Sequence, residues 1–179
     1  MTTQILIAGF GGQGILFSGK FLAYEGLIEN KEVSWLPSYG PEMRGGTANC
    51  SVILSDTKIG SPIISEPDIL IAMNKPSLEK YENDTAKDGF IFVDSSLIDK
   101  KVERDDVKAF YIPATKLASD NSLTGLANMI MIGYMLKHTD IIPYENILKA
   151  MQKVIPARKQ NMLDVNMKAV ELGYNYKED

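Results

Sequence analysis

The feature that most constrains the fold is an apolar run leading directly into closely spaced glycines. Residues 5–14 read Ile-Leu-Ile-Ala-Gly-Phe-Gly-Gly-Gln-Gly, and a helical pattern follows to about residue 28. In a strand–turn–helix unit, the spacing Gly9-x-Gly11-x-x-Gly14 permits a tight turn and close approach to a phosphate, with helix N–H groups aimed at the anion. The sequence predicts an anion-binding loop here; the alternative is tight strand–helix packing without a ligand.

Further apolar runs alternate with helical segments, which is typical of an α/β fold. Strands are predicted at residues 4–8, 33–36, 47–54, 68–73, 90–93 and 109–112. Residues 47–54 alternate with period two and are predicted to be antiparallel and half exposed, whereas the continuous apolar runs indicate buried parallel strands. Residues 55–58 are expected to turn this strand into a short hairpin. We therefore expect a Rossmann-like three-layer domain, with a mostly parallel, partly antiparallel sheet, over residues 1–179.

The last third of the chain is helical. Residues 123–136 are apolar all round and rich in methionine, so they form either a core helix or a subunit interface through which the isolated chain dimerises. A stripe of Ile147, Leu148, Met151, Val154 and Ile155 indicates the next helix. A final helix over residues 157–172 is expected to end at Gly173 as its C-terminal cap.

Composition excludes several classes of function. The net charge of -4 and the acidic balance disfavour nucleic-acid binding. Cys50 is the single cysteine, so this chain cannot build an internal disulfide or a four-cysteine iron–sulfur or zinc site. No segment resembles a signal peptide or a membrane span, and a cytoplasmic location without membrane contact is expected.

Ligands of open α/β sheets bind beyond the C-terminal ends of the strands. Those ends are predicted at Gly9, the loop of residues 38–46, Asn74, Asp94 and residues 113–115. A nicotinamide-binding enzyme needs an acidic side chain at the end of the second strand to hold the ribose. Glu29 and Glu32 precede that strand, so the alternative of a stand-alone nucleotide-binding oxidoreductase lacks its second anchor.

Residues 38–47 read Ser-Tyr-Gly-Pro-Glu-Met-Arg-Gly-Gly-Thr and form the second unusual stretch. A loop this rich in glycine and proline is typical of an ordered, functional connection. Arg44 is suited to a bidentate grip on a carboxylate or phosphate. Glu42 equally fits a simple ion pair with Arg44 across the loop.

The other candidate residues are interpreted as structural. His138 closes an apolar helix without a nearby carboxylate, which favours stabilisation of the helix C-terminus over catalysis. Cys50 is expected to be a buried small side chain, and Asp94 is expected to cap the chain locally. No catalytic residue and no metal ligands are identified, so the chain lacks a self-sufficient active site. This favours the interpretation that it is one subunit of a larger enzyme.

Four stretches together carry a family resemblance. They are residues 9–15 (Gly-Phe-Gly-Gly-Gln-Gly-Ile), residues 38–50, which continue from Ser38 to Cys50, Ser61-Pro62, and residues 67–74 (Pro-Asp-Ile-Leu-Ile-Ala-Met-Asn). In this order and at this chain length, the sequence resembles the gamma subunit of 2-oxoacid:ferredoxin oxidoreductases. It is most similar to 2-oxoglutarate and ketoisovalerate types, and less close to pyruvate types.

The resemblance implies a multisubunit enzyme that oxidatively decarboxylates a 2-oxoacid to an acyl-CoA and reduces ferredoxin. Thiamine diphosphate, magnesium and iron–sulfur clusters would reside on alpha, beta and ferredoxin-like delta subunits, with no cofactor bound by this chain alone. Its implied role is to complete the assembly and the coenzyme A side of the site; a purely structural subunit is the alternative. The residues expected near coenzyme A are Gly9, Gly11, Gly12, Gln13, Gly14, Ser38, Tyr39, Glu42, Arg44, Gly45, Gly46, Thr47 and Asn74.

Overall fold

A six-stranded mixed sheet forms the centre of the computed structural model, which describes residues 1–39 and 47–178. The strand order is β2-β3-β1-β4-β5-β6. The strands are β1 (Thr2–Phe10), β2 (Glu32–Tyr39), β3 (Thr47–Ser55), β4 (Ile69–Ala72), β5 (Phe90–Asp94) and β6 (Lys108–Ile112). Pairs β1–β4, β4–β5 and β5–β6 are parallel, and β3 is antiparallel to both β1 and β2. The predicted α/β class and mixed sheet are confirmed.

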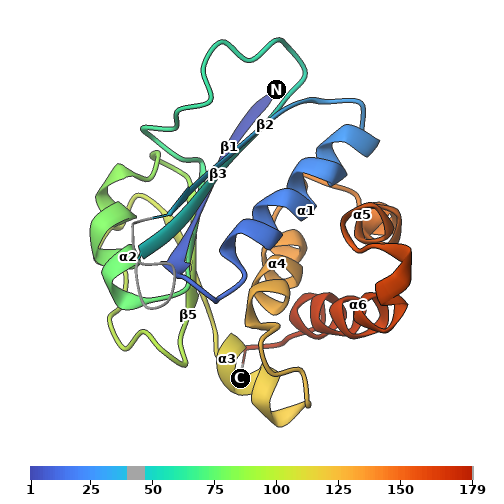
Figure 1. Ribbon diagram of the computed structural model, residues 1–179. Coiled ribbons are helices and arrows are strands. Elements are labelled where there is room, and N and C mark those ends of the chain that lie inside the picture. Colours follow the sequence, from blue (N-terminus) through green and yellow to red (C-terminus); the bar gives the residue numbers. More distant parts are fainter. Residues whose placement is uncertain (40–46, 179) are drawn as a thin grey trace.

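Helices cover both faces of the sheet, giving three layers (Figure 1). They are α1 (Ile15–Ile28), α2 (Lys75–Tyr81), α3 (Ala114–Asp120), α4 (Ala127–His138), α5 (Ile147–Val154) and α6 (Gln160–Tyr174). Short 3-10 turns occur at η1 (Glu82–Asp84), η2 (Tyr144–Asn146) and η3 (Ala157–Lys159). The larger core lies on the side of α1 and α4, whereas a smaller core forms under α2 around Leu78 and Ile98.

The predicted hairpin after β3 is wrong. Residues 56–68 run as an irregular segment from the end of β3 to β4. Strand β3 is already paired with β1 from Thr47 to Ser55 and with β2 from Ala48 to Ser55. The turn residues 55–58 therefore have no free strand edge to return along, because both neighbours of β3 are present.

Helix α1 lies close to β2 and β3 because glycines face the sheet. A Cβ on Gly26 would meet Leu54 Cδ2 at 2.5 Å, and one on Gly19 would collide with Cys50 Sγ. Ile15 and Leu22 are buried on the same helix. This face of α1 therefore lies close to the sheet, and tight packing holds the strand–turn–helix unit rigid.

Helix α4 is buried within the chain itself. Met129, Met131, Tyr134 and Met135 are each 0% exposed, so the helix is a core element. Dimerisation of the isolated chain through this helix, one of the two sequence expectations, is thereby excluded. A surface that already packs inside one chain cannot form an interface without unfolding.

The expected C-cap at Gly173 is also wrong, because α6 continues through it to Tyr174. Gly173 instead faces α4: an added Cβ would collide with the carbonyl oxygen of Ile130. Gly133 of α4 makes the reciprocal approach, since a Cβ there would collide with the carbonyl oxygen of Val170. Helices α4 and α6 therefore cross with their backbones in contact.

We predict that Gly133→Ala lowers the free energy of unfolding by about 2–4 kcal/mol, because the new methyl group meets rigid backbone. Urea unfolding measures the change. Gly60→Ala is the matched control, since nothing lies within 4 Å of its Cβ position, and a change below about 1 kcal/mol is expected there. Equal effects at the two positions would contradict the backbone contact between α4 and α6.

A second prediction concerns Glu25 of α1. Both of its carboxylate oxygens are buried without hydrogen-bond partners in the described part of the chain. Burial, assisted by the charge of Glu29, raises the pKa of Glu25 to about 8. Its contribution to stability is fully present below the unfolded pKa near 4.5 and is lost as the pH rises toward 8.

Glu25→Gln therefore matches the parent protein in stability near pH 4 and exceeds it by at least about 1 kcal/mol at pH 8. Thermal or urea unfolding across this range measures the difference. Glu79→Gln, at an exposed position of α2, is the control. A difference for Glu25→Gln that stays constant with pH would refute the buried, protonated carboxyl.

Candidate functional site

The predicted site residues that the structure describes lie at one edge of the sheet. This edge holds the C-terminal ends of β1 and β4, which are parallel, together with the end of β2 and the start of β3. In the ladder, Gly9 lies opposite Ala48, which lies opposite Tyr39, and Phe10 lies opposite Thr47. Ser38 precedes Tyr39 on β2, and Asn74 follows β4. Glu42, Arg44, Gly45 and Gly46 lie outside the described residues.

The glycine loop is closed by the side chain of Gln13. Its Oε1 accepts a hydrogen bond from the Phe10 N–H at 2.6 Å, and its Nε2 donates to the carbonyl oxygen of Met73 at 3.0 Å. Both polar groups of Gln13 are therefore used to tie the loop to itself and to β4. The backbone N–H groups of Phe10 and Gln13 are used within the loop, so donors toward a ligand come from its other backbone N–H groups.

The last loop residues adopt backbone conformations that favour glycine. Gly12 has φ +92° and Gly14 has φ +74°, both in the left-handed region. A Cβ on Gly14 would in addition collide with the Asn128 amide. Gly14 caps α1 without a side chain, and the first turn of α1 contains no acidic residue. The unsatisfied N–H groups of that turn give the positive helix end that suits an anion.

A pocket of about 350 Å³ opens beside this loop. It is lined by Gly12, Gln13 and Met73 together with residues from later in the chain: Leu97, Thr115, Ala118, Ser119, Thr124, Gly125 and Ala127. The polar groups among them are an amide and hydroxyls, and none is charged. Sequence reasoning named Thr115 at this edge but missed Ser119, Thr124 and Gly125. Gly125, in the short connection between α3 and α4, was the available signal for them.

Asp94 orients the first turn of α3 toward this pocket. Its buried carboxylate accepts hydrogen bonds from the Ser96 N–H at 3.1 Å and from the Thr115 hydroxyl at 2.6 Å. The Thr115 N–H also donates to Asp94 Oδ2, at 3.2 Å. The structural interpretation of Asp94 as a local cap is confirmed, because its oxygens are occupied by backbone and hydroxyl donors.

Asn74 has one free donor. Its Oδ1 accepts a hydrogen bond from the Ser77 N–H at 2.8 Å and thereby caps α2. The residue is 2% exposed, and its Nδ2 has no acceptor among the described residues. A buried donor without a partner costs about 1–3 kcal/mol, so its acceptor is expected to come from outside the described part of the chain.

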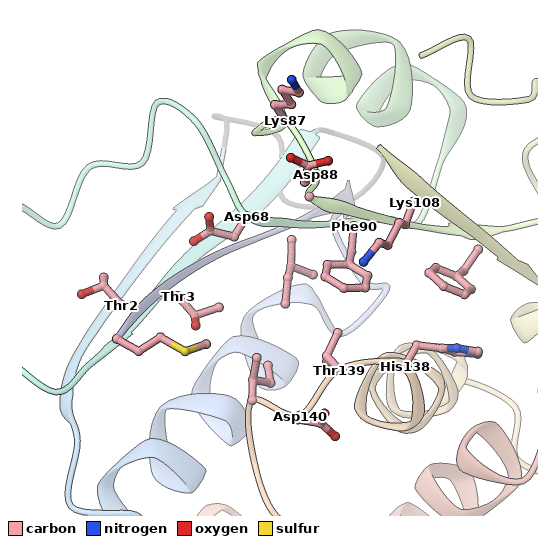
Figure 2. A pocket seen from close by; sticks show the side chains of 15 residues that line it. Thr2, Thr3, Asp68, Lys87, Asp88, Phe90, Lys108, His138, Thr139 and Asp140 are labelled. Atoms are coloured by element: carbon pink, nitrogen blue, oxygen red, sulfur yellow. The ribbon is translucent and has the colours of Figure 1, made fainter. Parts of the chain in front are cut away.

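A larger pocket, of about 600 Å³, lies at the opposite edge of the sheet (Figure 2). It is bordered by the starts of β1, β4, β5 and β6 and by the end of α4, and it contains none of the predicted site residues. Size alone favours this pocket. The C-terminal edge nevertheless carries the glycine loop and the helix N-terminus, and ligands of open α/β sheets bind there, so we place the candidate site at that edge.

His138 and Cys50 supply no chemistry to the candidate site. His138 packs against Phe110, with ring centroids 4.1 Å apart. Burial, and then the charge of Lys137, lowers the pKa of His138, so the imidazole is kept neutral and the expected charge stabilisation of the helix end is not supported. Burial raises the pKa of the Cys50 thiol to about 12, which confirms a buried, unreactive side chain.

Two absences hold for residues 1–39 and 47–178. No group of three or more His, Cys, Asp or Glu side chains in these ranges is placed to hold a metal ion. None of the helices there has both the length and the apolar character needed to cross a lipid bilayer.

Residues 4–176 match the family model for pyruvate ferredoxin/flavodoxin oxidoreductase. The chain belongs to this family. The resemblance inferred from the glycine loop and residues 38–50 is thereby confirmed at the level of the family.

Two curated relatives are similar over nearly all of the chain. It is 36% identical to ketoisovalerate oxidoreductase subunit VorA of Methanothermobacter thermautotrophicus over 95% of its length, and spans about a third (35%) of that relative. It is 35% identical to 2-oxoglutarate synthase subunit KorC of Methanocaldococcus jannaschii, covering 97% of this chain and 93% of the relative.

A solved structure agrees in fold. The keto/oxoacid ferredoxin oxidoreductase gamma subunit from Geobacter sulfurreducens superimposes with a TM-score of 0.81, at 27% identity and 96% coverage of both chains. The fold of this gamma subunit is therefore shared with the present chain over nearly its full length.

We predict that Gln13→Met loosens the glycine loop. The substitution keeps the side-chain length but removes both hydrogen bonds, so it should destabilise the protein by about 1–3 kcal/mol and speed hydrogen exchange at the Phe10 amide. Exchange measured by NMR and urea unfolding test this. Gln152→Met, at an exposed position of α5, is the control. Unchanged protection of Phe10 would show that Gln13 does not close the loop.

Proposed function

We propose that this chain is the gamma subunit of a multisubunit 2-oxoacid:ferredoxin oxidoreductase, which decarboxylates a 2-oxoacid oxidatively to an acyl-CoA and reduces ferredoxin. The observation that carries the proposal is the similarity to VorA and KorC over 95% and 97% of the chain. These relatives are named for ketoisovalerate and 2-oxoglutarate. We propose that the substrate is 2-oxoglutarate or a branched-chain 2-oxoacid.

The C-terminal edge of the sheet is the proposed coenzyme A side. Coenzyme A carries phosphates, which fit the first-turn N–H groups of α1 and the backbone of the loop from Gly9 to Gly14. The free Nδ2 of Asn74 supplies a further donor. Because the pocket beside the loop is lined by uncharged groups, Arg44 is the proposed source of positive charge. The remaining proposed contacts come from Ser38, Tyr39, Glu42, Gly45, Gly46 and Thr47.

The redox chemistry is proposed to belong to partner subunits. Carbanion and electron-transfer chemistry requires thiamine diphosphate with magnesium and iron–sulfur clusters, and the single cysteine of this chain cannot ligate a cluster alone. Alpha, beta and ferredoxin-like delta subunits would supply these groups. The length of VorA, about three times the matched portion, supports a version of this domain joined to further parts of the assembly.

The alternative of a stand-alone nicotinamide enzyme receives no support from the sheet. In the dinucleotide-binding arrangement, the second strand lies beside the first and carries the ribose-binding acid. Here β3 occupies that place, and β2 ends with Ser38 and Tyr39 at the outer edge. Glu32 begins β2 at the wrong end, as the sequence predicts.

Substitution of Arg44 tests the proposed function. In the reconstituted complex, Arg44→Ala should raise the KM for coenzyme A about tenfold or more, because one charge-assisted contact to an anion is lost, while the KM for the 2-oxoacid stays unchanged. Arg44→Lys should recover part of the loss. Arg158→Ala, at an exposed position of η3, is the control.

Steady-state kinetics with coenzyme A as the varied substrate provides the measurement. An unchanged KM for coenzyme A in the Arg44→Ala complex would favour the purely structural subunit instead. A parallel rise in the KM for the 2-oxoacid would place Arg44 on the substrate side of the site.

A further inference from the structure

Asn128, the second residue of α4, joins two parts of the chain that line the pocket beside the glycine loop. Gly12 and Gln13 line this pocket from the loop, and Thr124 and Ala127 line it from the start of α4 and the connection before it. We propose that Asn128 is a positioning residue, which holds the glycine loop and the first turn of α1 in the arrangement that receives the phosphates of coenzyme A. This proposal rests on the function proposed above.

The amide nitrogen of Asn128 makes two hydrogen bonds to the start of α1. Its Nδ2 donates to the carbonyl oxygen of Gly14 at 3.1 Å and to the Ser18 hydroxyl at 3.0 Å. The Ser18 N–H donates to the same Gly14 oxygen at 3.0 Å, which begins the hydrogen-bond pattern of the helix. Because Asn128 follows Ala127 and Gly14 follows Gln13, these bonds fix the two sets of pocket residues relative to each other.

Both side chains in this contact are buried. Asn128 is 4% exposed and Ser18 is 1% exposed, and the Ser18 hydroxyl also donates to Met129 Sδ at 4.0 Å. Hydrogen bonds that are shielded from water are stronger than exposed ones. Reversing the amide of Asn128 would place its oxygen against the Gly14 carbonyl oxygen, so the orientation of the amide is fixed.

Gly14 is the residue that permits this close approach. Its φ of +74° lies in the left-handed region, and a Cβ at this position would collide with the Asn128 amide. The last glycine of the loop therefore serves two needs, the turn into α1 and the space for Asn128. The contact between α1 and α4 is thus built into the loop itself.

Asn128 acts through Gly14 rather than on the ligand. It is not among the residues that line the pocket beside the loop, and it lines instead a neighbouring pocket of about 360 Å³ together with Gly14 and Gly125. A phosphate at the C-terminal edge would meet backbone N–H groups of the loop and of the first turn of α1. Asn128 fixes where those groups point, and donors held in place before binding favour affinity.

Asn128→Leu in the reconstituted complex tests the proposal. Leucine has nearly the same size as asparagine but cannot donate to Gly14 or Ser18. We expect the KM for coenzyme A to rise about fivefold to tenfold, whereas kcat and the KM for the 2-oxoacid stay within about twofold of the parent values. Steady-state kinetics with each substrate varied in turn measures this separation.

Asn166→Leu is the matched control. Asn166 is 2% exposed and lines the same neighbouring pocket, and its Oδ1, like that of Asn128, has no partner among the described residues. Its Nδ2, however, donates to the carbonyl oxygen of Met162 within its own helix, at 2.8 Å. The KM for coenzyme A should therefore equal that of the parent in this variant.

Hydrogen exchange at the Ser18 amide gives a measurement that needs no assembled complex. In the full chain, Asn128→Leu should speed this exchange about tenfold, because Gly14 loses its link to α4, and Asn166→Leu should leave it unchanged. Unchanged protection of Ser18 in Asn128→Leu would overturn the proposal. Ser18→Ala removes one of the two acceptors and should raise the KM for coenzyme A by a smaller factor, which keeps the kinetic test available if Asn128→Leu does not assemble.

The kinetic outcomes separate this proposal from the proposed function. If Arg44→Ala raises the KM for coenzyme A and Asn128→Leu does not, the positioning role is wrong while the coenzyme A side stands. If neither substitution changes that KM, both proposals are wrong. Equal changes in kcat and in the KM values of both substrates for Asn128→Leu would show a general structural role and would also overturn the positioning role.

Discussion

The antiparallel pairing of β3 between β1 and β2 determines what lies beside the glycine loop. Because nine residue pairs from Thr2–Ser55 to Phe10–Thr47 fix the register of β1 and β3, the start of β3 lies next to the end of β1. Tyr39 and Thr47, which flank residues 40–46, are thereby held at the same edge as Gly9. A parallel second strand beside β1 would place an acidic ribose contact there instead. Because β3 takes the place of such a strand, this edge instead holds Tyr39 and Thr47, the residues on either side of the segment that contains Arg44.

Tight backbone packing keeps this edge in a single arrangement. Gly19 and Gly26 bring α1 onto β2 and β3, and Gln13 ties the glycine loop to the residue that follows β4. Helices α4 and α6 cross at Gly133 and Gly173, and their buried side chains share one core with α1. Donors held in place before binding lose little conformational freedom when a ligand arrives. Among the described residues, however, the pocket beside the loop supplies uncharged groups. We therefore propose that the positive charge comes from Arg44 and the redox groups from partner subunits, so that this chain forms one side of a shared site.

Local sequence signals predicted the parts of the fold that depend on local chemistry. The glycine loop, the buried parallel strands, the antiparallel strand at residues 47–54 and the cap formed by Asp94 follow from residue type and period. Contacts between distant segments carried no such signal. Residues 55–58 do not form a hairpin because β3 is already paired on both sides. Gly173 lies within α6, where only a glycine fits against the backbone of α4. Helix α4 is buried by other parts of the same chain and is not an interface. For the same reason, the sequence did not identify Ser119, Thr124 and Asn128 as pocket residues. They line the two pockets because the fold places α3, α4 and their connection beside the glycine loop.

Acyl-CoA formation by the isolated chain is the most direct test of the central claim that this chain is an incomplete part of an active site. The purified chain would be incubated with coenzyme A, an electron acceptor and either 2-oxoglutarate or ketoisovalerate, beside the same chain co-purified with its partner subunits. The account predicts acyl-CoA and reduced acceptor from the co-purified assembly and none from the chain alone. Turnover of either 2-oxoacid by the chain alone would contradict the account.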